Sequence, residues 1–497
     1  MNKDEALRCL KESDRKVSMI SHISASLEWD LETAMPRKGE EERGEQLAYL
    51  SKLIHEEKTS PSVMEAVNSL EGEDLPLYDK ALYRIWEKEA RTSAFLPASF
   101  VERLSLAINS AHGKWAEARE KSDYSIFSPY LSELITLEKE MACLIGDGSY
   151  SALLDLYEDG MSTSRIDPIF SDLKTSIHSI MDSIDASGVE DGFLYKSYDE
   201  SSLHRFCMDL IDRIGFDRSR ASVGITLHPF TTTLGRDDVR ISTRYSDASL
   251  ADPIFSIIHE MGHAFYELYS SLNPEIRGTG LSGGLYMGIH ESQSRLWENL
   301  IGRSHAFWKF LYPDLVKAVP HLEDVSLDSF VKAINKPQSS GIRVNADELT
   351  YSLHIIMRYE IEKSLIDGNI RTEEIPDLWN ELSHSIVRYD VRNDSEGVLQ
   401  DSHWAGGSFG YFPSYAIGNI YSVMFYNRMV DDLGGKEAFD GYLSRGEYDN
   451  MISWLDRNIW NNGSVYTPDE LVYRVTGSKI DAKPYKEYLF NKFTSLY

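Results

Sequence analysis

Two histidines, four residues apart, flank a glutamate in the stretch FSIIHEMGHAFYELY, residues 255–269. If this stretch is helical, His259 and His263 project from neighbouring turns on one side and can bind the same metal ion. Glu260 then faces the same space, where its carboxylate can take a proton from a water molecule that the metal activates. The pattern is typical of a zinc peptidase, because zinc accepts imidazole nitrogens in this arrangement.

The residues around the motif predict the helix that such a site needs. Asp252 and Pro253 suit the start of a helix, as cap and first-turn residue, and Asn273-Pro274 suit its end. This context favours a metal site over two imidazoles in an ordinary buried helix. Between these limits the apolar residues recur every three or four positions, namely Ile254, Ile257, Ile258, Met261, Phe265 and Leu268.

A catalytic zinc ion needs a third protein ligand and an open position. Metzincins supply a histidine after a glycine at fixed positions, and here those positions hold Tyr266 and Tyr269, so that class is excluded. The alternative is a carboxylate from the next predicted helix, at 283–302. We favour Glu291, because Glu298 is better suited to pair with solvent or a nearby arginine. Zinc is the expected metal, although this donor set also accepts cobalt or manganese.

The rest of the chain predicts mostly helices. Segments with helical spacing of apolar residues occupy 39–57, 96–123, 124–146, 349–368 and 414–435, and the last two end in glycine. One stretch differs: ASVGITLHPFTTTL and DVRISTRY are rich in Thr, Val and Ile, with the turn GRDD between them. This pattern predicts a β-hairpin immediately before the metal helix. No long linker divides the chain, so we expect one large helical unit over residues 1–497, compatible with two lobes.

The composition narrows the functional classes. Lys and Arg total 51 against 79 Asp and Glu, which gives a formal net charge of −28. This acidity, without a cluster of basic residues, argues against nucleic acid and anionic membranes as partners. Three cysteines, Cys9, Cys143 and Cys207, lie far apart and favour a reducing compartment. A polar N-terminus predicts no signal peptide, and no apolar run is long enough to span a bilayer, so we expect a cytoplasmic protein.

Further motifs resemble the carboxypeptidase Taq family of metallocarboxypeptidases, in the family's order and along nearly the whole chain. They are HPF at 228–230, DVRIST at 238–243, HEMGH at 259–263, HES at 290–292, VLQDSHW at 398–404 and GYFPSYAIG at 410–418. The resemblance implies a gluzincin-like helical fold with a deep groove, a homodimer, and metal-dependent removal of single C-terminal residues from peptides with broad specificity. It also implies that Glu291 is the third ligand.

The implied reaction requires a group that holds the free carboxylate of the peptide, and arginine does this with two parallel hydrogen bonds. Arg343, on a glycine-flanked turn, is the first candidate. Arg358, on the following predicted helix, is the second, although it also suits an ion pair with Glu362 four residues later. Arg240 could bind a carboxylate or brace the predicted hairpin.

Four other residues are candidates for substrate contacts or catalysis. His228 is similar to a substrate-site histidine of the family. His403 lies two residues after Asp401, whose carboxylate could orient the imidazole. Tyr411 and Tyr415 lie four residues apart in a loop shaped by glycine and proline, so either hydroxyl could bind the substrate or its oxyanion. Packing is the alternative role for both, in a chain with 28 tyrosines.

Three functions stay open at this point. The first is a metallocarboxypeptidase with Glu260 as general base. The second is a helical zinc oligopeptidase or dipeptidase, which would cleave internally or release dipeptides. The third is a non-catalytic peptide-binding or chaperone-like protein, which an intact Glu260 argues against. We also hypothesise that the hairpin offers an edge strand to the peptide backbone.

Overall fold

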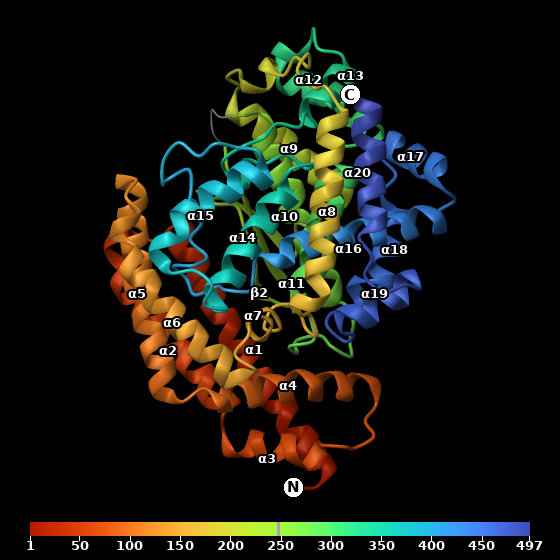
Figure 1. Cartoon of the computed structure of the whole chain (residues 1–497). Helices are drawn as coiled ribbons and strands as arrows, with labels where there is room; N and C mark the ends of the chain where they lie inside the picture. Colours follow the sequence, from red (N-terminus) through yellow and green to blue (C-terminus); the bar gives the residue numbers. More distant parts are fainter. Residues whose placement is uncertain (246–248) are drawn as a thin grey trace. The chain divides into compact units, whose positions relative to one another are not determined.

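The computed structural model describes residues 1–245 and 249–497 (Figure 1). Within these residues the chain forms two compact units, each built from three separate segments. The segments of unit 1 are Met1–Ser93, Val189–Ile334 and Tyr421–Ile480, and those of unit 2 are Ala94–Gly188, Asn335–Ile420 and Asp481–Tyr497. The single domain with two lobes and a groove stays a prediction.

Unit 1 contains the three-stranded sheet and the helices that surround it. Two of its helices are shared with unit 2: α4 ends there and α16 begins there. The strands are β1 (Ala221–Ile225), β2 (Thr231–Gly235) and β3 (Asp238–Thr243). The helices are α1 (Lys3–Thr33), α2 (Glu40–Lys58), α3 (Pro61–Leu70), α4 (Leu77–Phe95), α9 (Glu200–Ile214), α10 (Ala251–Ser270), α11 (Met287–Arg295), α12 (His305–Ala318), α13 (Leu327–Ile334), α16 (Pro413–Asp432), α17 (Lys436–Arg445), α18 (Asp449–Asn458) and α19 (Pro468–Thr476).

Unit 2 is built from helices and the loops between them. Its long helix α8 packs against the C-terminal helix α20, and the two run side by side in Figure 1. The central helix α14 packs against α6, α8 and α15. The helices are α5 (Ala98–Lys121), α6 (Ser128–Ile145), α7 (Tyr150–Leu154), α8 (Thr163–Ser183), α14 (Tyr351–Ile366), α15 (Ile375–Leu382) and α20 (Lys483–Leu496).

The predicted helices are present, and the mainly α fold is confirmed. Helices α2, α5, α6, α14 and α16 occupy the five segments named from apolar spacing. Gly368 follows α14 with a φ of +77°, a left-handed conformation in which glycine ends a helix without a steric penalty. Among the described residues, no helix combines the length and the apolar character that crossing a bilayer requires.

The predicted hairpin is part of a larger sheet with the order β1-β3-β2. Strands β2 and β3 form the antiparallel hairpin, and β1 pairs with β3 in parallel. The stretch 221–234 therefore holds two strands rather than one. Pro229 lies in the break between them, where a residue without an amide proton cannot continue a ladder. Val239 and Ile241 of β3 are buried, and β3 packs against α10, so the sheet positions the helix of the metal motif.

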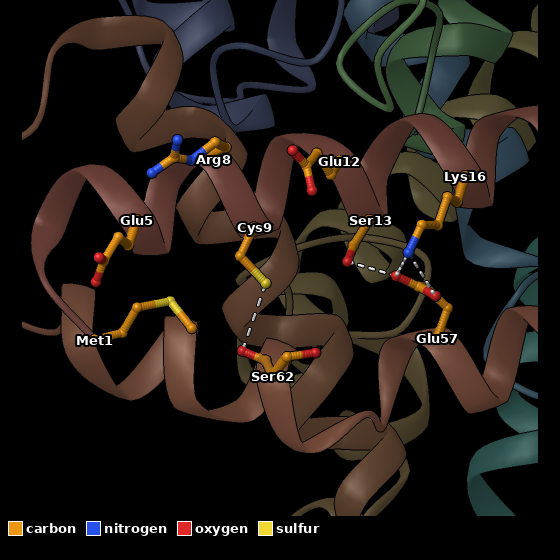
Figure 2. A pocket seen from close by; sticks show the side chains of 9 residues that line it. All are labelled: Met1, Glu5, Arg8, Cys9, Glu12, Ser13, Lys16, Glu57 and Ser62. Atoms are coloured by element: carbon orange, nitrogen blue, oxygen red, sulfur yellow. Dashed lines mark hydrogen bonds and ion pairs between the residues drawn. The ribbon is translucent and has the colours of Figure 1, made fainter.

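The N-terminal helix α1 contacts α2 and α3 around a hollow of about 430 Å³ (Figure 2). Here Ser13 Oγ donates to Glu57 Oε1 at 2.6 Å, and Lys16 Nζ lies 3.2 Å from the same oxygen. The Cys9 thiol faces the carbonyl oxygen of Ser62 at 3.6 Å. None of the residues predicted to act in catalysis lines this hollow.

Candidate metal centre and carboxylate-binding cluster

Helix α10 carries the HEMGH motif and begins at Ala251, two residues before the start predicted with Asp252 as cap. The predicted cap is corrected: Leu250 occupies the cap position, and the Ser249 hydroxyl accepts a hydrogen bond from the amide of Ala251 at 3.1 Å. Asp252 lies in the first turn instead, where a carboxylate still favours the helix N-terminus. The six apolar residues predicted to face the core are each at most 1% exposed, which fixes the rotation of α10.

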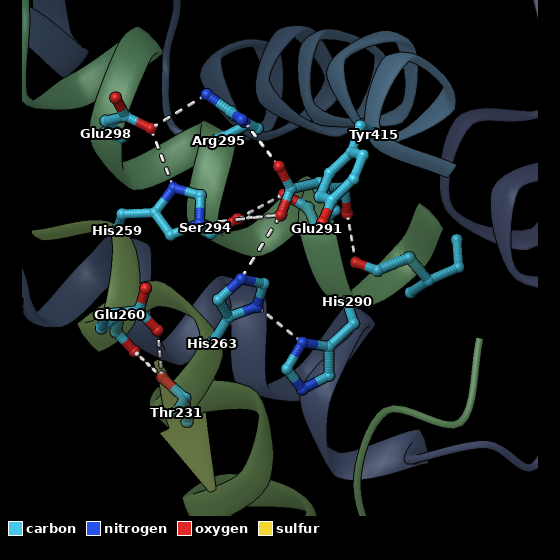
Figure 3. Close-up of polar contacts among 12 residues, drawn as sticks. Thr231, His259, Glu260, His263, His290, Glu291, Ser294, Arg295, Glu298 and Tyr415 are labelled. Carbon is cyan, nitrogen blue, oxygen red and sulfur yellow. Dashed lines mark hydrogen bonds and ion pairs between the residues drawn. The ribbon is translucent and has the colours of Figure 1, made fainter. Parts of the chain in front are cut away.

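The three residues predicted as metal ligands lie together in unit 1 (Figure 3). Oε2 of Glu291 lies 3.3 Å from Nε2 of His263 and 3.7 Å from Nε2 of His259. One donor atom from each residue lies within 4.8 Å of the other two. Two imidazoles and one carboxylate are a donor set that holds zinc and leaves a position open, so these residues fit the metal that the motif implies.

Gly262, between the two histidines, allows α11 to approach α10. A Cβ atom at this position would lie 2.7 Å from the carbonyl oxygen of Gln293 and 2.7 Å from Cα of Ser294. Because both are backbone atoms, they cannot turn aside as a flexible side chain would. The close approach brings Glu291, two residues before Gln293, to the histidines of α10.

Further protein groups hold the ligand side chains. Nδ1 of His259 lies 2.8 Å from Oε2 of Glu298, on the π-helical turn Leu296–Ile301. Arg295 donates from Nε to Glu291 at 2.6 Å and from Nη1 to Glu298 at 3.2 Å. The pairing of Glu298 with an arginine agrees with the sequence interpretation, whereas its contact with His259 was not predicted. Such outer contacts fix the orientation of metal ligands.

The protonation states of two proposed ligands, His263 and Glu291, suit metal binding. Burial lowers the pKa of His263 to about 3. Burial raises the pKa of Glu291, but Arg295 and the two histidines outweigh it and hold this pKa well below its ordinary value. A neutral imidazole and an ionised carboxylate are the forms that bind a metal ion.

Glu260 is buried beside the ligands and is held by the sheet. The hydroxyl of Thr231, on β2, donates to Oε2 of Glu260 at 2.6 Å and also lies 3.1 Å from its carbonyl oxygen. Burial raises the pKa of Glu260. Thr231 was not predicted, and its only sequence signal is its place in the strand before the motif. Its hydroxyl fixes the orientation of the carboxylate predicted to act as general base.

In unit 2, Asp401 binds two arginines. Arg343 donates to Oδ1 of Asp401 from Nε at 3.0 Å and from Nη2 at 2.7 Å, and Arg358 donates from Nε to Oδ2 at 2.6 Å. The expected orientation of His403 by Asp401 is therefore not found, because the charged guanidinium groups make the stronger hydrogen bonds. The alternative role of Arg358, an ion pair with Glu362, is not found either, because its guanidinium group binds Asp401.

Arg343, His403, Tyr411 and Tyr415 lie close together in unit 2. The guanidinium carbon of Arg343 lies 5.1 Å from the ring centroid of Tyr415, and the two tyrosine rings are 5.3 Å apart. Nε2 of His403 lies 3.2 Å from the hydroxyl of Tyr415. Burial, followed by the charge of Arg343, lowers the pKa of His403 to about 4, so the imidazole is neutral near pH 7.

Two candidates lie on the sheet of unit 1. His228 is exposed in the segment between β1 and β2. Arg240, on β3, donates to both carboxylate oxygens of Asp238 at 3.0 and 2.9 Å and lies over the ring of Trp29 at 5.7 Å. These contacts fit the alternative in which Arg240 braces the sheet.

The sequence and the fold are similar to those of known proteins. Residues 9–493 match the family model described as Carboxypeptidase Taq (M32) metallopeptidase. The chain is 38% identical to Carboxypeptidase 1 of Bacillus subtilis over 97% of both chains. It is 37% identical to Thermostable carboxypeptidase 1 of Thermus thermophilus over 100% of both. The structure of the M32 carboxypeptidase from Deinococcus radiodurans superposes with a TM-score of 0.94 at 31% identity, covering 99% of each chain. That of Pyrococcus furiosus carboxypeptidase gives 0.93 at 33% identity, covering 98% of this chain and 99% of the other.

Proposed function

Because the chain belongs to the carboxypeptidase Taq (M32) family and is a metallocarboxypeptidase, we propose that it removes single C-terminal residues from peptides with broad specificity. The observation that carries the proposal is the convergence of His259, His263 and Glu291 on one position, with Glu260 beside them. We propose that the ligands hold one zinc ion, with cobalt and manganese as alternatives.

Glu260 is the proposed general base. When bound, the metal ion supplies Lewis-acid chemistry, polarising the scissile carbonyl and making water more acidic. Glu260 takes the proton from the attacking water and later delivers it to the leaving amine. Its hydrogen bond from Thr231 and its burial support this role, because the carboxyl is oriented and its raised pKa suits a group that must accept and then release a proton.

The substrate contacts are assigned to residues among seven candidates. Arg343 binds the terminal carboxylate of the peptide, and Arg358 is the second candidate. The full burial of Arg358 against Trp379, at 4.7 Å from its ring centroid, favours Arg343. His403, Tyr411 and Tyr415 supply donors to the substrate or to the oxyanion. His228 is assigned to substrate binding by resemblance, and Arg240 is retained as a third, weaker candidate.

The sheet and the surface suggest further features. Strand β2 is at one edge of the sheet, which supports the hypothesis that it pairs with the peptide backbone.

The net charge of −28 argues against nucleic acid or anionic membranes as partners. Unpaired Cys9, Cys143 and Cys207 support a reducing compartment, proposed to be the cytoplasm. A homodimer is proposed from the family resemblance.

A time course on a peptide with a free C-terminus, followed by mass spectrometry, tests the proposal. A ladder of products shortened one residue at a time from the C-terminus, and stopped by a chelator, is expected. The same peptide with a C-terminal amide should resist cleavage, because it lacks the carboxylate that Arg343 binds. Internal cleavage or release of dipeptides would favour the oligopeptidase or dipeptidase alternative instead.

A further inference from the structure

His290 lies between the proposed ligand His263 and the carboxylate of Glu267. Nδ1 of His290 is 2.6 Å from Nδ1 of His263, a contact drawn in Figure 3, and Nε2 of His290 is 2.9 Å from Oε1 of Glu267. The two imidazole planes are inclined by only 24°, with centroids 4.5 Å apart. Nitrogens this close in nearly parallel rings meet edge to edge, as a hydrogen bond requires.

Glu267, the last residue in this chain of contacts, is held by two further hydrogen bonds. Glu267 accepts hydrogen bonds from the Thr233 hydroxyl at 3.0 Å and from the backbone amide of Gly284 at 2.9 Å. The backbone at Gly283 and Gly284 leaves room for the two side chains. A Cβ at Gly284 would lie 2.0 Å from Cδ2 of His290, and one at Gly283, where φ is +100°, would lie 2.5 Å from Oε2 of Glu267. A side chain at either position would therefore press on Glu267 or His290 and disturb their contact.

With a metal ion bound by Nε2 of His263, only one distribution of protons satisfies all of these contacts. Nε2 of His263 faces Glu291 and the metal position, so as a ligand it offers a lone pair and the proton resides on Nδ1. That N–H group points at Nδ1 of His290, which must therefore accept the hydrogen bond. His290 then carries its own proton on Nε2 and donates it to Glu267, an ionised carboxylate that can only accept. The reverse order would place two N–H groups, or two lone pairs, against each other.

We propose that His290 and Glu267 are positioning residues that set the tautomer and the ring orientation of His263, and thereby the affinity of the centre for its metal ion. The two histidine ligands are then held in different ways. His259 donates directly to a carboxylate, Glu298, at 2.8 Å, whereas His263 donates to the imidazole of His290, which in turn donates to Glu267. Contacts of this kind are worth about 10- to 100-fold in metal affinity.

Competition between the purified protein and a chromophoric chelator for Zn²⁺ measures this contribution. We expect His290→Leu to weaken Zn²⁺ binding by about 10- to 100-fold, because leucine fills a similar space but cannot accept the hydrogen bond from His263. His290→Gln should restore most of the affinity, because its amide oxygen accepts from His263 while its NH₂ group donates to Glu267. His321→Leu is the matched control: His321 is also half-buried, but its Nε2 contacts the carbonyl oxygen of Phe193, and its loss should leave the affinity unchanged.

The proton distribution can be read without any variant. In the zinc-loaded wild-type protein labelled with ¹⁵N-histidine, long-range ¹H–¹⁵N spectra should show His290 protonated on Nε2 and His263 on Nδ1. His290 protonated on Nδ1, or Zn²⁺ affinity of His290→Leu equal to that of the wild type, would overturn the proposal. The inference rests on the proposed metal centre, and His263→Ala separates the two. If that variant binds Zn²⁺ as the wild type does, the centre itself is wrong; if it loses Zn²⁺ while His290→Leu does not, only the role of His290 is wrong.

Discussion

Arg343 and Asp401 form a hydrogen-bonded ion pair inside unit 2, with two contacts of 3.0 and 2.7 Å to the same carboxylate oxygen. Arg358 binds the other oxygen. Burial raises the pKa of Asp401, but the two arginines lower it far below its ordinary range, so the carboxylate is ionised. One negative charge therefore faces two positive ones, and the remaining positive charge suits the capture of a peptide carboxylate.

Replacing Arg343 with Lys tests the proposed carboxylate contact. Lysine keeps the charge but lacks the planar fork, and a hydrogen bond to a charged group contributes about 1.5–3 kcal/mol. Steady-state kinetics should show KM raised by about 10- to 100-fold, with a smaller change in kcat. Arg358→Lys is the matched variant, and a larger rise in KM for Arg358→Lys than for Arg343→Lys would exchange the two roles.

Replacing Asp401 with Asn should destabilise the protein. The substitution leaves two buried guanidinium groups without their anion, and breaking a buried pair costs about 3–5 kcal/mol. Urea unfolding followed by circular dichroism measures the loss. Asp390→Asn is the control, because the Asp390 side chain is 88% exposed in its pair with His384 and an exposed pair contributes about 0–1 kcal/mol. Equal unfolding midpoints for the two variants would contradict the structural importance of Asp401.

Glu260→Gln should abolish turnover and retain the metal. The amide cannot accept the proton of the attacking water, so kcat should fall by about 100- to 10,000-fold. Glu260 is not one of the three proposed ligands, and its hydrogen bond from Thr231 can be kept by the amide oxygen. Zinc content, measured by mass spectrometry after dialysis, should equal that of the wild type; a variant that lost its zinc would place Glu260 among the ligands.

Gly262→Ala should weaken the proposed metal centre by pushing the backbone of α11 away from α10. The added Cβ would press on backbone atoms of α11 at 2.7 Å, and overpacking of this kind costs about 1–3 kcal/mol. The expected result is a lower melting temperature together with weaker Zn²⁺ binding. Gly44→Ala on α2 is the matched control, since nothing lies within 4 Å of its added Cβ. That change should stabilise the helix by about 0.5–1 kcal/mol, so equal effects of the two changes on the melting temperature would refute the steric argument.

Glu138 should make the stability of the protein depend on pH. Its carboxyl group is 0% exposed, and burial, with the nearby Glu362, raises its pKa from 4.5 to about 8. Between these values the unfolded chain has released the proton and the folded protein retains it, so stability falls as pH rises through this window. At about 1.4 kcal/mol per pKa unit, the full loss is on the order of 5 kcal/mol.

Glu138→Gln isolates this contribution. The variant cannot ionise, so its stability measured by urea unfolding should fall less than that of the wild type between pH 5 and pH 8. Because the difference in slope is compared, any constant effect of the buried amide cancels. Glu133→Gln, an exposed position on the same helix α6, should follow the wild type. Parallel curves for all three proteins would show that Glu138 is already ionised in the folded protein.

The helices and the two histidines of the candidate metal site could be predicted because they depend on local spacing. Apolar residues at three- and four-residue intervals predicted α10, α14 and α16, and the same periodicity places His259 and His263 on one side of α10. The family motifs contain Glu291 and the two tyrosines, whereas Arg343 was chosen because the implied reaction needs an arginine that binds a carboxylate. The hairpin was predicted from strand-forming residues, but the parallel pairing of β1 was not, because alternation in sequence does not specify which strand lies beside which.

The sequence by itself thus determined the family, the mainly helical fold and the residue types of the candidate metal site. The tertiary structure decided which groups these side chains contact. Glu298 binds His259, Thr231 donates to Glu260, and Arg343 rather than His403 pairs with Asp401. The tertiary structure also placed His290 between His263 and Glu267. These pairs join residues from different elements, and a hydrogen bond depends on distances of about 3 Å and on direction. Periodicity along the chain gives the face of a helix, whereas only the packing of one element against another brings two side chains within that distance.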